Sequence, residues 1–193
     1  MINNEIIKRA GFDKLEQLED NIFYIKNFMS KEDIAVAYSI ISNLSEQDWS
    51  ILDNELVEDW KGKFYDHNNN KLNNSLRSKV DRVASIFKDY KIIGYNRILR
   101  QPPGANMVAH IDPINDIGNG SKREYAAIIY LNDNYDGGEI SYINFGIKIK
   151  PEAGSLIIFK TGPDYLHEVL EVSGNTPRYC LPGFIFSSWP SSD

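Results

Sequence analysis

Two of the three histidines in this chain stand where they could share a metal ion with a carboxylate. His110 and Asp112 form a His-x-Asp pair in a strand-like run, and residues i and i+2 of a strand point to the same face. His167 lies in a second strand-like run, with Leu166 before it and Glu168 after it. An isolated His-x-Asp pair is more often a polar strand face, but two histidines with one carboxylate form the facial triad of non-haem Fe(II) oxygenases. The remaining histidine, His67, stands in an Asn-rich run that predicts an exposed loop.

A cation follows the second histidine after a turn. If residues 173–176 form a hairpin turn, Glu171 lies opposite Arg178 and shares the parity of His167, so Arg178 faces the same side as His167. Pro177 has no N–H to donate and fits this register only at the start of a strand. A guanidinium is a planar fork that suits a carboxylate, and a buried arginine without an anion is costly. The pattern therefore predicts an acidic co-substrate between the metal and Arg178.

Composition limits the classes of protein and partner. The 193 residues are 42% hydrophobic and 12% aromatic, enough for one domain over residues 1–193 with one core. A net charge of −6 gives no basic surface, which argues against nucleic acid and anionic membranes as partners. Cys180 is the only cysteine, so an intramolecular disulfide and a Cys-based zinc site are excluded. Neither a signal-like segment nor a bilayer-length apolar run is present, and we expect a cytoplasmic location; the oligomeric state stays open.

The local patterns place helices first and strands second. We expect an amphipathic helix over residues 5–20, a strand over 22–25, a helix that begins at Ser30 with Asp33 in the capping-box position, and a helix over 76–87. Short extended segments separated by Pro, Gly, Asn and Asp follow, near residues 92–100, 106–111, 124–132, 139–143, 146–150, 155–159, 167–172 and 178–186. This order predicts an α+β fold with a jelly roll or sandwich and helices packed on one sheet. We expect residues 1–90 to be mainly helical support, 91–190 to be the core, and the loop 115–122 to be a lid.

These elements together resemble the Fe(II)/2-oxoglutarate-dependent dioxygenases of the prolyl 4-hydroxylase type, over roughly residues 90–190. The matching elements are, in order, His110-x-Asp112, Tyr130-Leu131-Asn132-Asp133, Gly137-Gly138-Glu139-Ile140, Pro151-x-x-Gly154-Ser155, His167-Glu168-Val169 and Arg178-Tyr179. The resemblance implies a double-stranded β-helix (jelly-roll) core that carries the catalytic site. It implies that His110, Asp112 and His167 bind Fe(II), and that Arg178 and Tyr130 bind 2-oxoglutarate. The other co-substrate is O2, with ascorbate as a possible addition.

The resemblance also implies a reaction, hydroxylation of a prolyl or other residue in a peptide or protein, coupled to decarboxylation of 2-oxoglutarate to succinate. Three positions depart from the family pattern: Gln101 and Met107 stand where tyrosines are common, and Ala126 where threonine is common. These departures affect substrate specificity more than the metal chemistry. A free amino acid or small metabolite is therefore an alternative substrate, and a non-catalytic jelly-roll binding module is a reading of another class.

Overall fold

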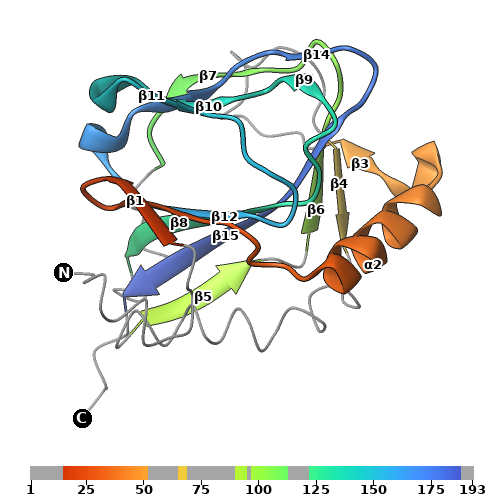
Figure 1. Cartoon of the computed structure of the whole chain (residues 1–193), viewed down its shortest axis with the longest axis horizontal. Helices are drawn as coiled ribbons and strands as arrows, with labels where there is room; N and C mark the ends of the chain where they lie inside the picture. Colours follow the sequence, from red (N-terminus) through yellow and green to blue (C-terminus); the bar gives the residue numbers. More distant parts are fainter. Residues whose placement is uncertain (1–14, 52–64, 69–89, 95–96, 113–121, 188–193) are drawn as a thin grey trace.

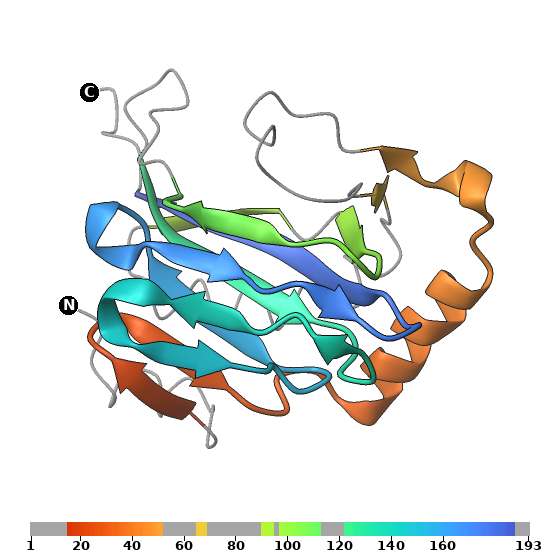
Figure 2. The same ribbon diagram turned by 90° about the horizontal axis from the view of Figure 1, so that it is seen from above.

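A computed structural model of the chain describes residues 15–51, 65–68, 90–94, 97–112 and 122–187. The described part consists mostly of antiparallel strands in two sheets that face each other, with an α-helix at one side (Figures 1 and 2). This is the jelly-roll core that the turn-separated short strands predict. Among the described residues, no helix has both the length and the apolar character needed to cross a bilayer.

The larger sheet contains nine described strands. Eight of them lie side by side in the order β1 (Leu15–Glu19), β2 (Ile22–Ile25), β12 (Leu156–Lys160), β8 (Arg123–Tyr130), β15 (Arg178–Ser187), β6 (Arg97–Gln101), β4 (Tyr65–Asn68) and β3 (Ser50–Ile51). The ninth, β5 (Tyr90–Gly94), pairs with the second half of β15, while β6 pairs with its first half. Strand β8 is thus flanked on both sides; five of its eight residues are buried and the other three are half-buried.

The smaller sheet has four strands in the order β11 (Ile147–Ile149), β10 (Ile140–Tyr142), β13 (His167–Val169) and β7 (Met107–His110). A separate two-stranded ladder joins β9 (Asp136–Gly137) to β14 (Val172–Ser173). Three short 3₁₀ turns complete the described elements: η1 (Glu46–Asp48), η3 (Ile143–Phe145) and η4 (Pro163–Tyr165). Most strands after residue 100 match the predicted segments, but the segment predicted over 92–100 contains two strands, β5 and β6, and the one over 167–172 contains β13 and the start of β14.

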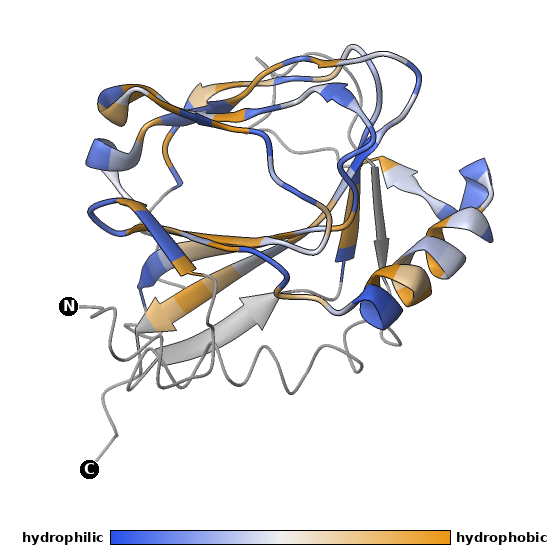
Figure 3. Cartoon of the chain, in the orientation of Figure 1, coloured by the Kyte–Doolittle hydropathy of each residue, from blue (hydrophilic) through white to orange (hydrophobic). Residues whose placement is uncertain are grey.

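The space between the two sheets is filled by an inner cluster of buried side chains. Its members from the larger sheet include Ile22, Tyr24, Ala126, Tyr130, Ile157 and Phe159, and those from the smaller sheet are Ile140, Tyr142 and Ile149. Strands β2, β8 and β12 of the larger sheet carry continuous apolar runs and pack on both faces, whereas apolar and polar residues alternate along β10 and β11 of the smaller sheet (Figure 3). Each fully buried large apolar side chain contributes about 1.5–3 kcal/mol.

A second cluster lies on the outer face of the larger sheet, under helix α2 (Lys31–Ser42). The predicted capping box is confirmed: the Ser30 hydroxyl accepts from the Asp33 N–H, and the Asp33 carboxylate accepts from the Ser30 N–H. Ala37 is the fully buried residue of the helix. Gly154, in the turn before β12, allows helix α2 to lie close to this turn, since a Cβ at position 154 would lie 2.7 Å from Cδ1 of Ile34 on the helix. The helix therefore packs on the sheet, as the predicted α+β fold requires.

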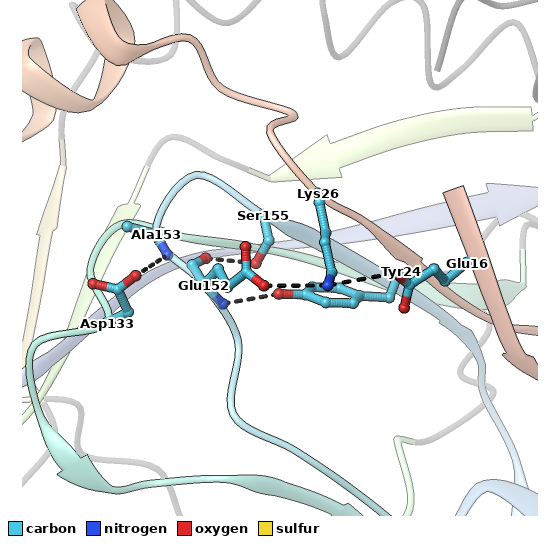
Figure 4. Close-up of polar contacts among 7 residues, drawn as sticks. All are labelled: Glu16, Tyr24, Lys26, Asp133, Glu152, Ala153 and Ser155. Atoms are coloured by element: carbon cyan, nitrogen blue, oxygen red, sulfur yellow. Dashed lines mark hydrogen bonds and ion pairs between the residues drawn. The ribbon is translucent and has the colours of Figure 1, made fainter. Parts of the chain in front are cut away.

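Polar contacts hold the turn before β12 (Figure 4). The Glu152 N–H donates to the Tyr24 hydroxyl at 2.9 Å, and the Ala153 N–H donates to the Asp133 carboxylate at 3.0 Å. Lys26 forms ion pairs with Glu16 at 3.4 Å and with Glu152 at 3.3 Å. The turn is thus bonded both to β2 and to the segment that follows β8, which fixes where β12 begins.

Two local predictions are wrong within the described residues. Residues 15–19 form strand β1 and not the end of a helix, because Leu15 and Leu18 point to opposite faces and pack against the outer and the inner cluster respectively. Spacing alone made them look like one helical face. His67 lies on strand β4 and not in a loop. The predicted helix over 76–87 lies outside the described residues, as do residues 5–14 of the predicted N-terminal helix and residues 115–121 of the predicted lid.

The predicted hairpin between Glu171 and Arg178 is also wrong. Val172 pairs with Gly137 in the small ladder, and Arg178 pairs with Gln101 in the larger sheet. The turn at 173–177 carries the chain from one sheet to the other, since Pro177 has no N–H with which to continue a ladder. His167 and Arg178 therefore belong to different sheets that face the same interior.

Candidate functional site

Three side chains form a row across the inner face of the smaller sheet. Tyr142 on β10 lies directly opposite His167 on β13, and His167 lies directly opposite His110 on β7. Directly opposed residues of antiparallel strands share a face. The two imidazole rings have centroids 4.3 Å apart. Strand pairing thus brings together two histidines that are 57 positions apart, as 167 minus 110 gives.

Asp112 completes the predicted triad. The ligand atoms of His110, Asp112 and His167 all lie within 4.8 Å of one another. His167 is buried, whereas His110 and Asp112 are half-buried, so one side of the cluster is open to an incoming molecule. Two imidazole nitrogens and one carboxylate match the donor set of non-haem Fe(II) sites. The sequence prediction that these three residues lie together is thus met by the geometry, and their binding of a metal remains a proposal.

Backbone carbonyls set the tautomer of both histidines. Nδ1 of His110 lies 2.8 Å from the Val108 carbonyl oxygen, and Nδ1 of His167 lies 2.9 Å from that of Tyr165. A carbonyl only accepts, so each Nδ1 carries the proton and each Nε2 keeps its lone pair for a metal. Burial lowers the pKa of His167. The charge of Asp112 acts to raise this pKa, and His110 acts to lower it further. The ring is therefore kept neutral, the form that binds metal.

Arg178 places a buried cation on the opposite sheet. It is 2% exposed, and its guanidinium lies 4.9 Å from the ring centroid of Tyr130. Nη1 donates to Oε1 of Gln101 and lies 3.9 Å from Sγ of Cys180. No carboxylate in the described part of the chain pairs with this guanidinium. Burial of a guanidinium without an anion is unfavourable. We therefore expect a negatively charged ligand to bind beside Arg178.

Five buried polar atoms around this interior have no hydrogen-bond partner among the described residues. They are the hydroxyls of Tyr130, Tyr135 and Tyr142, Nε2 of Gln101 and Nε of Arg178. Leaving one buried donor unpaired costs about 1–3 kcal/mol, and such groups are rare in folded proteins. Burial raises the pKa of Tyr130 and of Tyr135, and the Arg178 charge opposes both shifts. Neutral hydroxyls and one guanidinium are donors that fit a carboxylate.

Asn132 holds the backbone on both sides of Arg178. Its Nδ2 donates to the Pro177 carbonyl at 2.8 Å, and its Oδ1 accepts from the Tyr179 N–H at 2.8 Å. Asn132 is 1% exposed. The asparagine therefore positions the residue between its two partners. The sequence singled out Asn132 only as part of a motif, because the two bonds depend on how β8 and β15 lie together.

The remaining sequence candidates fall on either side of the site. Gln101 is buried against Arg178, Met107 packs against the inner cluster, and Ala126 lies in that cluster with Tyr130. Arg100 is occupied elsewhere, because it donates to Glu46 at 2.7 and 2.8 Å on the outer side. The sequence did not reveal that Tyr142 lies beside His167 in the row of three side chains, because this depends on the pairing of β10 with β13.

Arg123 stands near the metal centre. Its guanidinium carbon lies 3.7 Å from the ring centroid of Phe184, and its Nε is buried without a hydrogen-bond partner among the described residues. Burial lowers the pKa of Arg123, and the Asp112 carboxylate acts in the opposite direction. Arg123 is thus a second, half-buried cation, and its pKa responds to the charge of Asp112.

A jelly roll with a His-Asp-His cluster and a buried arginine is the arrangement of 2-oxoglutarate-dependent oxygenases. Residues 93–186 match the family model described as 2OG-Fe(II) oxygenase superfamily. The matched segment contains His110, Asp112, His167 and Arg178, so the chain is similar to that superfamily over the part that carries the site.

The solved structures that resemble the chain include several prolyl hydroxylases. A Trichoplax adhaerens prolyl hydroxylase, in complex with a peptide fragment of the hypoxia inducible factor oxygen degradation domain, superimposes with a TM-score of 0.72 at 21% identity, covering 95% of this chain and 91% of that one. A Pseudomonas putida prolyl-4-hydroxylase gives 0.65 at 21% identity, covering 88% and 94%. The viral collagen prolyl hydroxylase of Paramecium bursaria Chlorella virus-1, in its 2OG complex, gives 0.62 at 16% identity, covering 86% and 96%. These likenesses confirm the predicted fold.

A curated relative matches a short segment. Mouse prolyl 3-hydroxylase 2 is 38% identical over 56 residues, which is 26% of this chain and 8% of that protein. The rat protein of the same name is 36% identical over the same length. The chain thus spans under a tenth of the length of the curated relatives that it matches.

Proposed function

We propose that the protein is an Fe(II)- and 2-oxoglutarate-dependent hydroxylase that acts on a prolyl or other amino-acid residue of a peptide or protein. The observation that carries the proposal is that two half-sites face one interior: a His-Asp-His cluster on one sheet, and on the other a buried Arg178 that pairs with no carboxylate of the described residues. The solved prolyl hydroxylases with this fold support a peptide substrate. A reducing, cytoplasmic location fits the proposal and stays a prediction.

The residues present fit the cofactor and both co-substrates. Nε2 of His110, Nε2 of His167 and the Asp112 carboxylate would hold Fe(II), leaving the side away from the sheet open. Arg178 and Tyr130 would bind the distal carboxylate of 2-oxoglutarate through charge-assisted hydrogen bonds. Bound iron supplies the oxidation, in which O2 and 2-oxoglutarate give succinate, CO2 and a hydroxylated C–H carbon. The inner cluster excludes water around these groups.

The test is direct. Purified protein with Fe(II) and ascorbate should convert 2-oxoglutarate to succinate, and a panel of proline peptides should show one that gains an oxygen atom by mass spectrometry. Protein that binds no 2-oxoglutarate in the presence of Fe(II) would refute the proposal. Succinate formation without any oxidised peptide would indicate a substrate other than these peptides, and would still support the proposed reaction class.

A second candidate is a hydroxylase of a free amino acid or small metabolite. Arg123 supports it, because a half-buried cation with an unpaired Nε beside Asp112 could bind the free carboxylate of a small substrate. Free amino acids and small carboxylic acids in the same panel distinguish the two. Arg123→Gln should raise KM for such a small acid more than for a peptide whose residue has no free carboxylate. The third candidate, a non-catalytic binding module, is less well supported, because it does not explain the unpaired donors of Arg123 and Tyr142 near the triad or of Arg178 on the opposite sheet.

A further inference from the structure

The hydroxyl of Tyr142 is the buried polar group nearest the metal centre that has no assigned role. The side chain is 0% exposed, and its hydroxyl has no hydrogen-bond partner among the described residues. Phenylalanine would fill the same apolar position without burying a polar atom. An unpaired buried donor is unfavourable unless a ligand accepts from it. The hydroxyl therefore indicates a bound acceptor.

The ring of Tyr142 is held firmly beside the second histidine. It meets the edge of Phe159, with centroids 5.2 Å apart, and its centroid lies 5.9 Å from that of His167. Phe159 also contacts His167, with centroids 4.7 Å apart. Since Tyr142 and His167 are directly opposed across strands, both point into the space between the sheets. The hydroxyl is thus aimed into the interior from a fixed ring.

Contacts connect Tyr142 to both ends of the interior. Its ring packs beside His167 at the metal end. It also belongs to the inner cluster that contains Tyr130, and the guanidinium of Arg178 lies 4.9 Å from the ring centroid of Tyr130. A dicarboxylate that joins the two ends passes through this cluster.

The other donors of the pocket are placed for the arginine end. Gln101 is bonded to Arg178 through its Oε1, and Tyr135 lies near the same guanidinium. Tyr142 and Arg123 are the donors left for the end of the ligand next to the triad, and Tyr142 is the one that lies in a row with both histidines.

We propose that the Tyr142 hydroxyl is a co-substrate-binding group that donates a hydrogen bond to the carboxylate at the 2-oxo acid end of 2-oxoglutarate, beside the metal. The inference rests on the proposed function and adds a ligand contact to it. The neutral phenol, which is the ordinary form of tyrosine at neutral pH, is the form that donates. Affinity for the 2-oxo acid end then depends on this chain's own tyrosine as well as on the metal.

Tyr142→Phe tests the proposal, because it removes one oxygen and keeps the ring. Calorimetric titration of 2-oxoglutarate into Mn(II)-loaded protein should give a Kd roughly ten- to a hundredfold weaker than wild type, as expected for a lost hydrogen bond to a charged group. The ligand-free protein should melt at the wild-type temperature or higher, since no internal bond is lost. Unchanged affinity together with a lower melting temperature would assign the hydroxyl a purely structural role and overturn the proposal.

Tyr24→Phe is the matched control. Tyr24 is also a buried inner-cluster tyrosine, but its hydroxyl accepts from the Glu152 N–H at 2.9 Å. Its loss should lower the melting temperature and leave the Kd for 2-oxoglutarate unchanged. The two variants thus predict opposite patterns from the same chemical change.

Competition with half-ligands identifies the end that Tyr142 contacts. Pyruvate keeps the 2-oxo acid end without the distal carboxylate, and butyrate keeps a chain that ends in one carboxylate, without the 2-oxo acid end. Tyr142→Phe should weaken competition by pyruvate and not by butyrate, whereas Tyr130→Phe should do the reverse. A Tyr142→Phe protein that loses butyrate competition instead would overturn the assignment. Wild-type protein that fails to bind 2-oxoglutarate with metal would refute the proposed function itself, whereas equal binding by wild type and variant refutes only the role of Tyr142.

Discussion

Asn132→Ala should destabilise the protein and weaken 2-oxoglutarate binding together. The amide makes two bonds of 2.8 Å to the backbone at Pro177 and Tyr179, and it is 1% exposed. Alanine leaves a carbonyl and an N–H without partners, at about 1–3 kcal/mol each. Because both groups are only half-buried, we expect a total of roughly 2–4 kcal/mol. For a chain of this size, that corresponds to a fall in melting temperature of roughly 5–15 °C.

The binding effect follows from the position of Arg178 between the two anchored residues. Freed from both bonds, the start of β15 should hold the guanidinium less precisely, and the Kd for 2-oxoglutarate should rise about tenfold. Asn132→Asp keeps the acceptor for the Tyr179 N–H and loses the donor to Pro177, so it should fall between alanine and wild type in melting temperature. Thermal denaturation and calorimetric titration measure the two effects on the same samples.

Asn144→Ala is the matched control for this experiment. Asn144 also donates to backbone carbonyls, at 3.1 and 3.4 Å, but it is exposed, so its loss should cost less than about 0.5 kcal/mol. If Asn132→Ala melts like Asn144→Ala and binds 2-oxoglutarate like wild type, the anchoring argument is wrong.

Three further predictions test other parts of the site. His167→Ala should abolish metal-dependent succinate formation and 2-oxoglutarate binding while circular dichroism retains the β-rich spectrum; full activity would remove His167 from the metal centre. Arg178→Gln should weaken 2-oxoglutarate binding at least a hundredfold, measured by calorimetry, with little loss of ligand-free stability, because no described carboxylate pairs with the guanidinium; a large loss of stability with normal binding would contradict this. Gly138→Ala should cost about 1–3 kcal/mol in denaturant unfolding, since φ is +65° and the new Cβ would lie 3.0 Å from Cε2 of Tyr135. Gly104→Ala, at φ +85° with open space around it, should cost less, and equal costs would show that contact with Tyr135 is unimportant.

The metal cluster could be predicted from the sequence because its information is local. A His-x-Asp pair on extended backbone fixes the direction of two side chains, and only one other histidine lay in a strand-like run. Ala126, Ile128 and Tyr130 share one parity on β8 and all face the inner cluster, whereas Ala127 and Ile129 face the outer one. Period-two alternation survives any choice of partner strand.

Predictions that depended on the partner of a strand were less reliable. Arg178 is buried as predicted, but it reaches the interior from the larger sheet and not through a hairpin with Glu171. Leu15 and Leu18 have a spacing that fits a helix as well as a strand packed on both faces, and only pairing with β2 decides between them. The role of Tyr142 was invisible for the same reason, since its neighbour His167 is 25 positions away, as 167 minus 142 gives.

The separation of the site between two sheets has a thermodynamic consequence. The triad lies on and beside the four-stranded sheet, whereas Tyr130 and Arg178 lie on the larger one. A dicarboxylate bound at both ends would act as a non-covalent cross-link between the layers. Ligand that binds only the folded state adds about 2.7 kcal/mol of stability at a hundred times its Kd, and here that energy would oppose opening of the two layers. Slow amide exchange would then spread over both sheets when metal and 2-oxoglutarate are present together.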